Sequence, residues 1–313
     1  MSGSAPSPSP RLLTEQWPVI AGMSSGLLWS FVPGRLKNRL RDPHAVHEQT
    51  IKPASAALVD AYVAWCGVND DRYAQSLPPH FFAHYGMPMV ARLTSLAPCN
   101  MLSVVNQGVY FRLRSWLPRN AKLMLRGELV SCRRDGQRMR VHTRVTVGSA
   151  ADAEAMTVDT LAAVVVGKSA GRSRPAAGGP HWQTVGEWSA DRADGQRFFF
   201  LTGDFNPIHT LWPVARRTRF GGCILHGFGT LARTIETIQN GGPRLLEIDA
   251  RFIKPNLLPS GPNRVQVGEA ADADGFRPLQ VLNHQGEAML GGRYVDTVRG
   301  LAGVLPQPDF KVR

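Results

Sequence analysis

The sequence predicts an α+β protein made of two similar units, each a helix packed on an antiparallel sheet. Residues 167–180, GKSAGRSRPAAGGP, interrupt an alternating apolar pattern with glycine, proline, serine and arginine, which is typical of a connection between units. The same order of elements recurs on both sides of this connection. A shift of 141 residues also aligns 111–128 with 252–269 without a gap, and five of the eighteen residue pairs are identical. Together these observations indicate a duplicated helix and sheet unit.

The first half contains a helix, an apolar stretch and four strands. Apolar spacing predicts a helix around 55–67. In the apolar stretch at 80–97, Gly86 and Pro88 break any helix, so that we expect a short, kinked or displaced one. Alternating patterns bounded by turn residues predict strands at 108–116, 122–132, 138–148 and 159–167.

The second half repeats this order. A helix near 189–202 leads into a polar loop, and a second helix from about 227 to 239 stops at the Gly241-Gly242 pair. Alternating patterns then predict strands near 244–254, 262–270, 277–283 and 287–297.

The expected organisation has five parts. The composition of MSGSAPSPSP predicts a disordered start. The parts are a flexible leader (1–18), a first unit (19–166), a linker (167–182), a second unit (183–300) and a tail (301–313). The apolar segment 19–32 is too short to span a bilayer and lies between two prolines, so we expect a packing arm, with an amphipathic docking segment as the alternative.

Charge and cysteine content narrow the class of protein. Thirty-six Lys and Arg against 24 Asp and Glu give a formal net charge of +12, which favours an anionic partner. A nucleic acid is the weaker choice, because the arginines are scattered and no recognised binding motif accompanies them. The four cysteines form no CxxC pair, so we expect neither a disulfide framework nor a metal cluster, and we expect a cytoplasmic location.

Residues 198–228 carry the strongest candidate for chemistry. Gly203 suits a left-handed backbone after a helix, and Pro207 disfavours helix in the residue before it, so 203–209 should form a rigid turn. In that turn the side chains of Asp204 and His209 can converge on one water or substrate proton. Asn206 is placed to bind its own loop. A metal site is disfavoured, since no fourth ligand is near.

The pair His226-Gly227 opens the following helix. A helix N-terminus presents unpaired backbone N–H groups and a partial positive charge, and Gly227 has no side chain to block an approaching oxygen. This is the arrangement of an oxyanion site. Taken alone, His226 is as well explained as a packing or loop-tethering residue.

These motifs resemble the MaoC-like family of (R)-specific enoyl-CoA hydratases. The resemblance rests on LTGDFNPIH, VARRTRFGGCILHGF and RFIKPNLLPSG, and its layout is similar to the double-hotdog members, in which only the C-terminal unit keeps the catalytic loop. It implies that Asp204 and His209 are the catalytic pair and that the N–H of Gly227 binds the thioester oxygen. Asn206 matches the residue that fixes the loop, while Ile235, beside Thr234, replaces a serine of some members.

The resemblance implies a hydratase or dehydratase acting on trans-2-enoyl thioesters, linked to coenzyme A or to an acyl carrier protein, without a metal or redox cofactor. Phe220, in the phenylalanine-glycine turn, and His226 are expected at the substrate. A homodimer is possible. Two alternatives remain: a non-catalytic acyl-thioester-binding protein and a hotdog thioesterase.

The first half is expected to be catalytically silent and to hold the acyl chain. Asp70 and Asp71 have no histidine five residues later. The incomplete helix at 80–97 should leave apolar space beside Phe81, Phe82, Met87 and Met89, which predicts a preference for medium or long chains.

Overall fold

The computed structural model describes residues 8–30, 45–97, 104–136, 138–165, 180–240 and 242–297. The two halves contain comparable series of elements. The first half has η1 (Pro10–Gln16), α1 (Trp17–Ser30), β1 (His47–Ile51), α2 (Ala56–Trp65), η3 (Pro79–Phe81), α3 (Phe82–Tyr85), α4 (Met87–Thr94), β2 (Val104–Leu113), β3 (Leu123–Asp135), β4 (Arg138–Gly148) and β5 (Met156–Val165). The second half has β6 (Trp182–Ala190), α5 (Asp194–Thr202), α6 (Pro207–Thr210), α7 (Trp212–Ala215), α8 (Gly227–Gln239), β7 (Leu245–Phe252), β8 (Ser260–Gly268), β9 (Arg277–Leu282) and β10 (Ala288–Asp296).

The strands form one antiparallel sheet in the order β1-β3-β4-β5-β2-β7-β10-β9-β8-β6. Read from the centre outwards, the second half repeats the first: β7 stands for β2, β10 for β5, β9 for β4, β8 for β3 and β6 for β1. The halves join where β2 pairs with β7, in a register that places Tyr110 opposite Asp249. This mirrored order confirms the α+β fold class and the double-hotdog plan.

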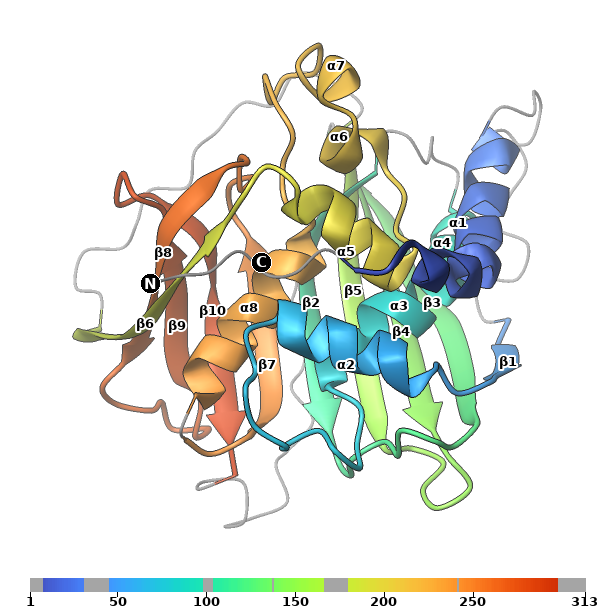
Figure 1. Ribbon diagram of the computed structural model, residues 1–313, viewed down its shortest axis with the longest axis horizontal. Coiled ribbons are helices and arrows are strands. Elements are labelled where there is room, and N and C mark those ends of the chain that lie inside the picture. The colour runs from blue at the N-terminus through green and yellow to red at the C-terminus, as the bar shows by residue number, and fades with distance from the viewer. Residues whose placement is uncertain are drawn as a thin grey trace.

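The long helices lie on one face of the sheet. Figure 1 shows α2, α5 and α8 in front of the strands, with α3 beside them and with α6 and α7 projecting at the top. The prediction of an uninterrupted helix at 227–239 is confirmed by α8, and the predicted break in the first half is confirmed by the division into α3 and α4 at Gly86. The second half therefore has one unbroken helix at the position where the first half has the two shorter helices α3 and α4.

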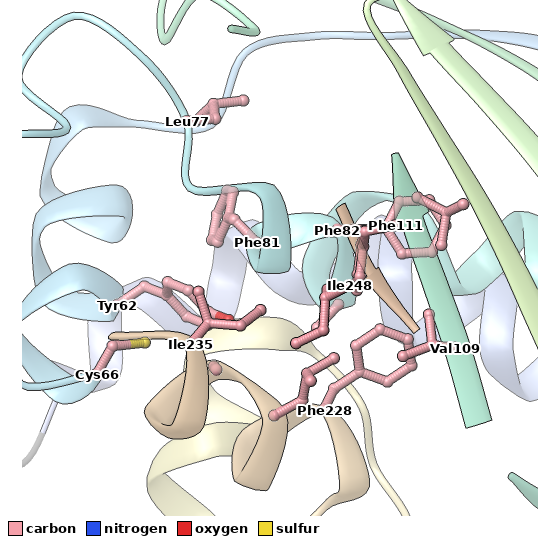
Figure 2. Packing of buried hydrophobic residues seen from close by; sticks show 14 of the residues in the cluster. Tyr62, Cys66, Leu77, Phe81, Phe82, Val109, Phe111, Phe228, Ile235 and Ile248 are labelled. Carbon is pink, nitrogen blue, oxygen red and sulfur yellow. The ribbon is translucent and has the colours of Figure 1, made fainter. Parts of the chain in front are cut away.

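The apolar core is continuous between the halves. Phe82 of α3 lies edge-to-face with Phe111 of β2 at 6.0 Å between ring centroids, and Phe228 of α8 lies 6.2 Å from the same Phe111 ring. Figure 2 shows these rings together with Ile248 of β7. Since each large aromatic side chain buries extensive apolar surface, the shared core ties the halves into one body.

Two buried carboxylates also join the halves. Asp194 of α5 accepts hydrogen bonds from Trp65 Nε1 of α2 at 2.8 Å and from Arg233 of α8 at 3.1 Å. Glu236, near the end of α8, accepts from Tyr73 at 2.7 Å and lies 2.6 Å from His80 Nε2. Buried charges are tolerated when they are paired in this way, so these clusters fix α8 relative to the first half.

Several expected boundaries differ from the structure. The strands β1 and β6 were not predicted, and α5 begins at Asp194 because 189 and 190 belong to β6. The leader is shorter than 1–18: η1 starts at Pro10, and both Leu12 and Gln16 are buried. A packing arm is confirmed at its start, where Gly22 of α1 lies against Pro88.

Parts of the expected organisation lie outside the described residues, namely 1–7, 166–179, Gly241 and the tail 301–313. Cys99 also lies outside them, whereas Cys66, Cys132 and Cys223 are free thiols. Within the described ranges, no helix has both the length and the apolar character needed to cross a membrane.

Candidate active site

The loop that follows α5 has the backbone conformation that its residues predict. Gly203 ends α5 in the left-handed region, with φ of 74°. Asn206 caps α6, because its side-chain oxygen accepts a hydrogen bond from the N–H of Ile208 at 3.2 Å. A Cβ on Gly195 of α5 would collide with the carbonyl oxygen of His209, so this glycine allows α5 to lie directly against the loop. Gly203 and Asn206 therefore fix the backbone of the loop, and α5 packs directly against it.

One hydrogen bond fixes the tautomer of His209. Its Nδ1 lies 2.7 Å from the carbonyl oxygen of Ile224. A carbonyl only accepts, so Nδ1 must carry the proton and Nε2 must hold a free lone pair. A partly buried imidazole oriented in this way is prepared to take a proton at Nε2.

His226 connects three parts of the site. Its ring stacks on that of His209, with 3.8 Å between centroids, and its Nε2 donates to the backbone carbonyl of Asp204 at 2.9 Å. It is also the residue that precedes the first turn of α8, next to Gly227. Because His226 is buried and makes these contacts, the structure places it behind the site as a tethering residue.

Burial shifts the pKa values of Asp204 and His209 in opposite directions. Loss of solvation raises the pKa of Asp204 above its ordinary value, although the neighbouring His209 opposes this shift. Loss of solvation lowers the pKa of His209, and the ring of His226 lowers it further. Both shifts favour the uncharged forms, a carboxylic acid and a neutral imidazole. Asp204 and His209 are therefore candidates for a general acid and a general base on one loop.

Gly227 is the first residue of α8, whose early N–H groups have no partner within the helix. No side-chain oxygen caps this helix. A Cβ on Gly227 would lie 3.1 Å from the ring of Phe252, so a larger residue would press on that ring. The free N–H groups and the partial positive charge at the start of a helix such as α8 stabilise an oxygen that gains negative charge.

The N-terminal arm packs on the start of the loop. A Cβ on Gly203 would stand 2.8 Å from Val19 of α1 and 3.1 Å from the side-chain oxygen of Gln16. The same oxygen of Gln16 lies 2.9 Å from Nδ1 of His84. Gln16 and Val19 therefore support the glycine that positions Asp204.

The sequence also singles out Phe220, Thr234 and Ile235 near the site. Phe220 is partly buried beyond α7, where the guanidinium of Arg219 lies 5.0 Å from its ring centroid. The hydroxyl of Thr234 donates to the carbonyl of Thr230 inside α8, and Ile235 is buried, so neither supplies a hydroxyl to the site.

The predicted apolar space beside Phe82 is filled. The ring of Phe82 is fully buried, and it lies so close to Gly86 that a Cβ there would collide with it. Phe81 and Met89 are likewise buried, while Met87 is partly buried against the core. The break in the helix predicts a void, but the buried side chains of Phe81, Phe82 and Met89 pack this region instead.

Three contributors were not predicted from the sequence: the Ile224 carbonyl, Gly195 and the arm residue Gln16. Gly195, inside the apolar helix at 194–202, is a usable signal that another segment packs closely against that helix. The Ile224 carbonyl and Gln16, in contrast, make contacts between distant parts of the chain. Among the described residues, no three His, Cys, Asp or Glu side chains gather as a metal site would require.

Comparison with known proteins matches the site to a family. Residues 176–266 match the family model described as MaoC like domain. A stretch of 65 residues, 21% of this chain, is 37% identical to 3-hydroxyacyl-thioester dehydratase X of Mycobacterium tuberculosis, and it spans 23% of that protein's length.

Solved structures resemble the whole fold. The crystal structure of HtdX from Mycobacterium tuberculosis superposes with a TM-score of 0.63 at 24% identity, over 79% of this chain and 99% of HtdX. A MaoC-like dehydratase from Phytophthora capsici gives a TM-score of 0.61 at 17% identity, over 82% and 97%. At these identities the likeness establishes the fold, and the family match lies over the Asp204 loop and the start of α8. Residues 176–266 are therefore similar to a MaoC-like domain, within a fold of two helix and sheet units that resembles these solved structures.

Proposed function

We propose that the protein adds water reversibly across the double bond of trans-2-enoyl thioesters to give (R)-3-hydroxyacyl thioesters. The observation that carries the proposal is the hydrogen bond from His209 Nδ1 to the Ile224 carbonyl, 2.7 Å long. It leaves Nε2 free to accept a proton, next to a carboxyl group whose pKa is raised by burial. The similarity to a 3-hydroxyacyl-thioester dehydratase supports the same chemistry.

The proposed hydration step uses three groups. A water held between Asp204 and His209 gives a proton to Nε2 of His209 as its oxygen bonds to the β-carbon. The thioester oxygen gains negative charge and accepts the N–H of Gly227. The carboxyl of Asp204 then protonates the α-carbon as the enolate collapses. Transfer of the proton from the imidazolium back to the Asp204 carboxylate through water restores the pair, and dehydration follows the same steps in reverse.

The carrier is proposed to be coenzyme A or an acyl carrier protein, since the net charge of +12 suits an anionic partner. A preference for medium or long chains remains part of the proposal. A tail lodged in the first half would have to displace the ring of Phe82, so Phe82→Ala is expected to raise kcat/KM for long chains more than for crotonyl thioesters.

The test is an assay with crotonyl-CoA and a longer enoyl-CoA. Loss of the conjugated double bond, with chiral analysis of the product, is expected to give the (R)-3-hydroxyacyl ester. Release of free thiol without hydration would show a thioesterase instead. Binding of the thioester without turnover, in wild-type protein and in His209→Ala alike, would show the non-catalytic alternative.

A further inference from the structure

A convex ridge follows the catalytic loop. We use the name ridge for residues 211–220, which include α7 and the turns after it. Its ends are drawn together at the site, where the N–H of Ile224 bonds the carbonyl of Ile208 at 3.3 Å. Figure 1 shows α6 and α7 projecting beyond the long helices. The ridge is thus a projection whose base is the segment that carries His209.

The ridge is ordered and exposes large apolar side chains. Ala215 is buried, and its N–H bonds the Leu211 carbonyl at 2.9 Å. Leu211, Trp212 and Val214 nevertheless expose 43%, 57% and 41% of their surfaces. Three large apolar side chains are thus exposed within four positions of the chain, and exposed apolar residues that gather in one place mark interaction sites more often than scattered single residues do.

The ridge also carries positive charge that no acidic residue of the same segment neutralises. Arg216, Arg217 and Arg219 are exposed, and the sequence has no Asp or Glu between Asp204 and Glu236. Their recorded contacts are with neutral groups: Arg216 lies 4.8 Å from the centroid of Trp212, and Arg217 donates to the carbonyl of Pro213 at 2.9 Å. Elsewhere in the described chain, Arg72 and Arg197 are paired with carboxylates. The ridge arginines are therefore available to an external anion.

We propose that the ridge docks the protein on an anionic lipid bilayer. Trp212 and its apolar neighbours would enter the boundary between headgroups and acyl chains, while the guanidinium groups would bind lipid phosphates. Tryptophan and arginine side chains suit this boundary because each combines an apolar body with a polar or charged end. The ridge projects beyond the long helices (Figure 1), and a fluid surface can deform around such a projection. Docking would hold the Asp204 loop beside the membrane.

Sedimentation with lipid vesicles tests the proposal, using the full-length protein. The wild type is expected to sediment with vesicles of phosphatidylcholine mixed with phosphatidylglycerol and to stay in solution with phosphatidylcholine alone. Replacing Arg216, Arg217 and Arg219 with Gln should weaken binding on the order of a hundredfold, since each basic residue near an anionic surface contributes about fivefold. The double variant Leu211→Ser with Trp212→Ser should lose binding even at low salt.

Matched controls separate the ridge from general charge and stickiness. Replacing the exposed Arg126, Arg133 and Arg134 of β3 with Gln removes the same charge elsewhere, and Ile253→Ser removes a side chain that is 56% exposed. Both controls should bind like the wild type. An equal loss in the controls, or no binding of wild type to the anionic vesicles, would overturn the proposal. So would ridge variants that bind vesicles normally but lose activity only with substrates on an acidic carrier protein. Sedimentation needs no substrate, so its outcome is independent of the proposed reaction.

Discussion

The two halves place very different side chains on the same backbone turn. Helix α2 is followed by Gly67 with φ of 91°, and helix α5 by Gly203 with φ of 74°. Counting from these glycines, the residue next along the chain is Val68 in the first half and Asp204 in the second. Val68 is buried in the apolar core, whereas Asp204 is partly exposed. The turn alone therefore does not make a site, and the choice of the following residue decides its role.

The same contrast holds at the positions of the two histidines. Six residues after the glycines stand Tyr73 and His209, and the residues that introduce α3 and α8 are His80 and His226. Tyr73 and His80 both bind the carboxylate of Glu236. The side chains of Tyr73 and His80 are thus satisfied within the protein, whereas Nε2 of His209 keeps a free lone pair. Where the second half has Gly227, the first has the buried Phe81, which covers the helix start.

Helix α8 links these two roles. Its N-terminus adjoins the Asp204 loop, and its last turn carries Glu236, which anchors the first half. The comparison teaches that contacts of α8 hold the two units together, and that the unit with the Asp204 loop is the one to which we assign the proposed chemistry.

The largest effect is expected from removing the second-half pair. Asp204→Asn and His209→Ala should each lower kcat for hydration by about 10²–10⁴-fold, the usual contribution of a general acid or base. The fold should persist, because neither side chain belongs to the apolar core. Steady-state rates with an enoyl thioester and thermal unfolding curves measure both outcomes. Near-wild-type turnover in either variant would remove that residue from the mechanism.

A large effect on stability, and not on chemistry, is expected at the other end of α8. Glu236→Ala leaves His80, Tyr73 and Arg72 without their shared carboxylate. Losing one partner of a buried ionic cluster typically lowers the free energy of unfolding by about 3–5 kcal/mol. Denaturant titration measures the loss, and kcat of the folded protein should stay close to that of the wild type. A fall in kcat equal to that of His209→Ala would mean that the cluster takes part in catalysis.

Much of this arrangement was predictable, because it depends on local chemistry. The glycine turn and the helix opened by His226 follow from residue types and spacing, whereas the assignment of Asp204 and His209 as the reacting pair stays a prediction that rests on the family resemblance. The edge strands were missed because β1 and most of β6 are exposed and lack apolar alternation. The Ile224 carbonyl and the filling of the space by Phe82 depend on contacts between distant segments, which no local pattern encodes.

A moderate effect is expected when the tether of the pair is removed. His226→Phe keeps a flat ring against His209 but loses the hydrogen bond to the Asp204 carbonyl. Such a bond is worth about 1 kcal/mol, so kcat should fall about fivefold, with little change in KM. His226→Gln, which can still donate, should recover part of the rate. An unchanged kcat in the phenylalanine variant would show that the carbonyl needs no tether.

A smaller effect on activity is expected from a change of pH. The base must be unprotonated, so activity is lost as pH falls through the pKa of His209, which burial lowers. The acid must be protonated, so activity is lost as pH rises through the pKa of Asp204, which burial raises. The lowered pKa of His209 therefore moves the acid limb of the kcat/KM profile below the ordinary histidine pKa of about 6.5, and the raised pKa of Asp204 moves the alkaline limb above the ordinary aspartate pKa of about 3.9. A profile that declines with falling pH around that value would instead indicate an ordinary, solvated imidazole.

The smallest effect is expected from the same chemical change in the silent half. Asp70→Asn replaces a carboxylate three residues after the left-handed Gly67, as Asp204→Asn does next to Gly203. Asp70 is half exposed and pairs with Arg72 at 2.5 Å, which lowers its pKa to about 2. An exposed pair of this kind contributes about 0–1 kcal/mol, so the unfolding curve should move little and kcat should stay within about twofold, too small a loss for a general acid. Asp71→Asn should behave alike. A loss of turnover in Asp70→Asn comparable to that in Asp204→Asn would show that the first half also holds a reacting group and is not silent.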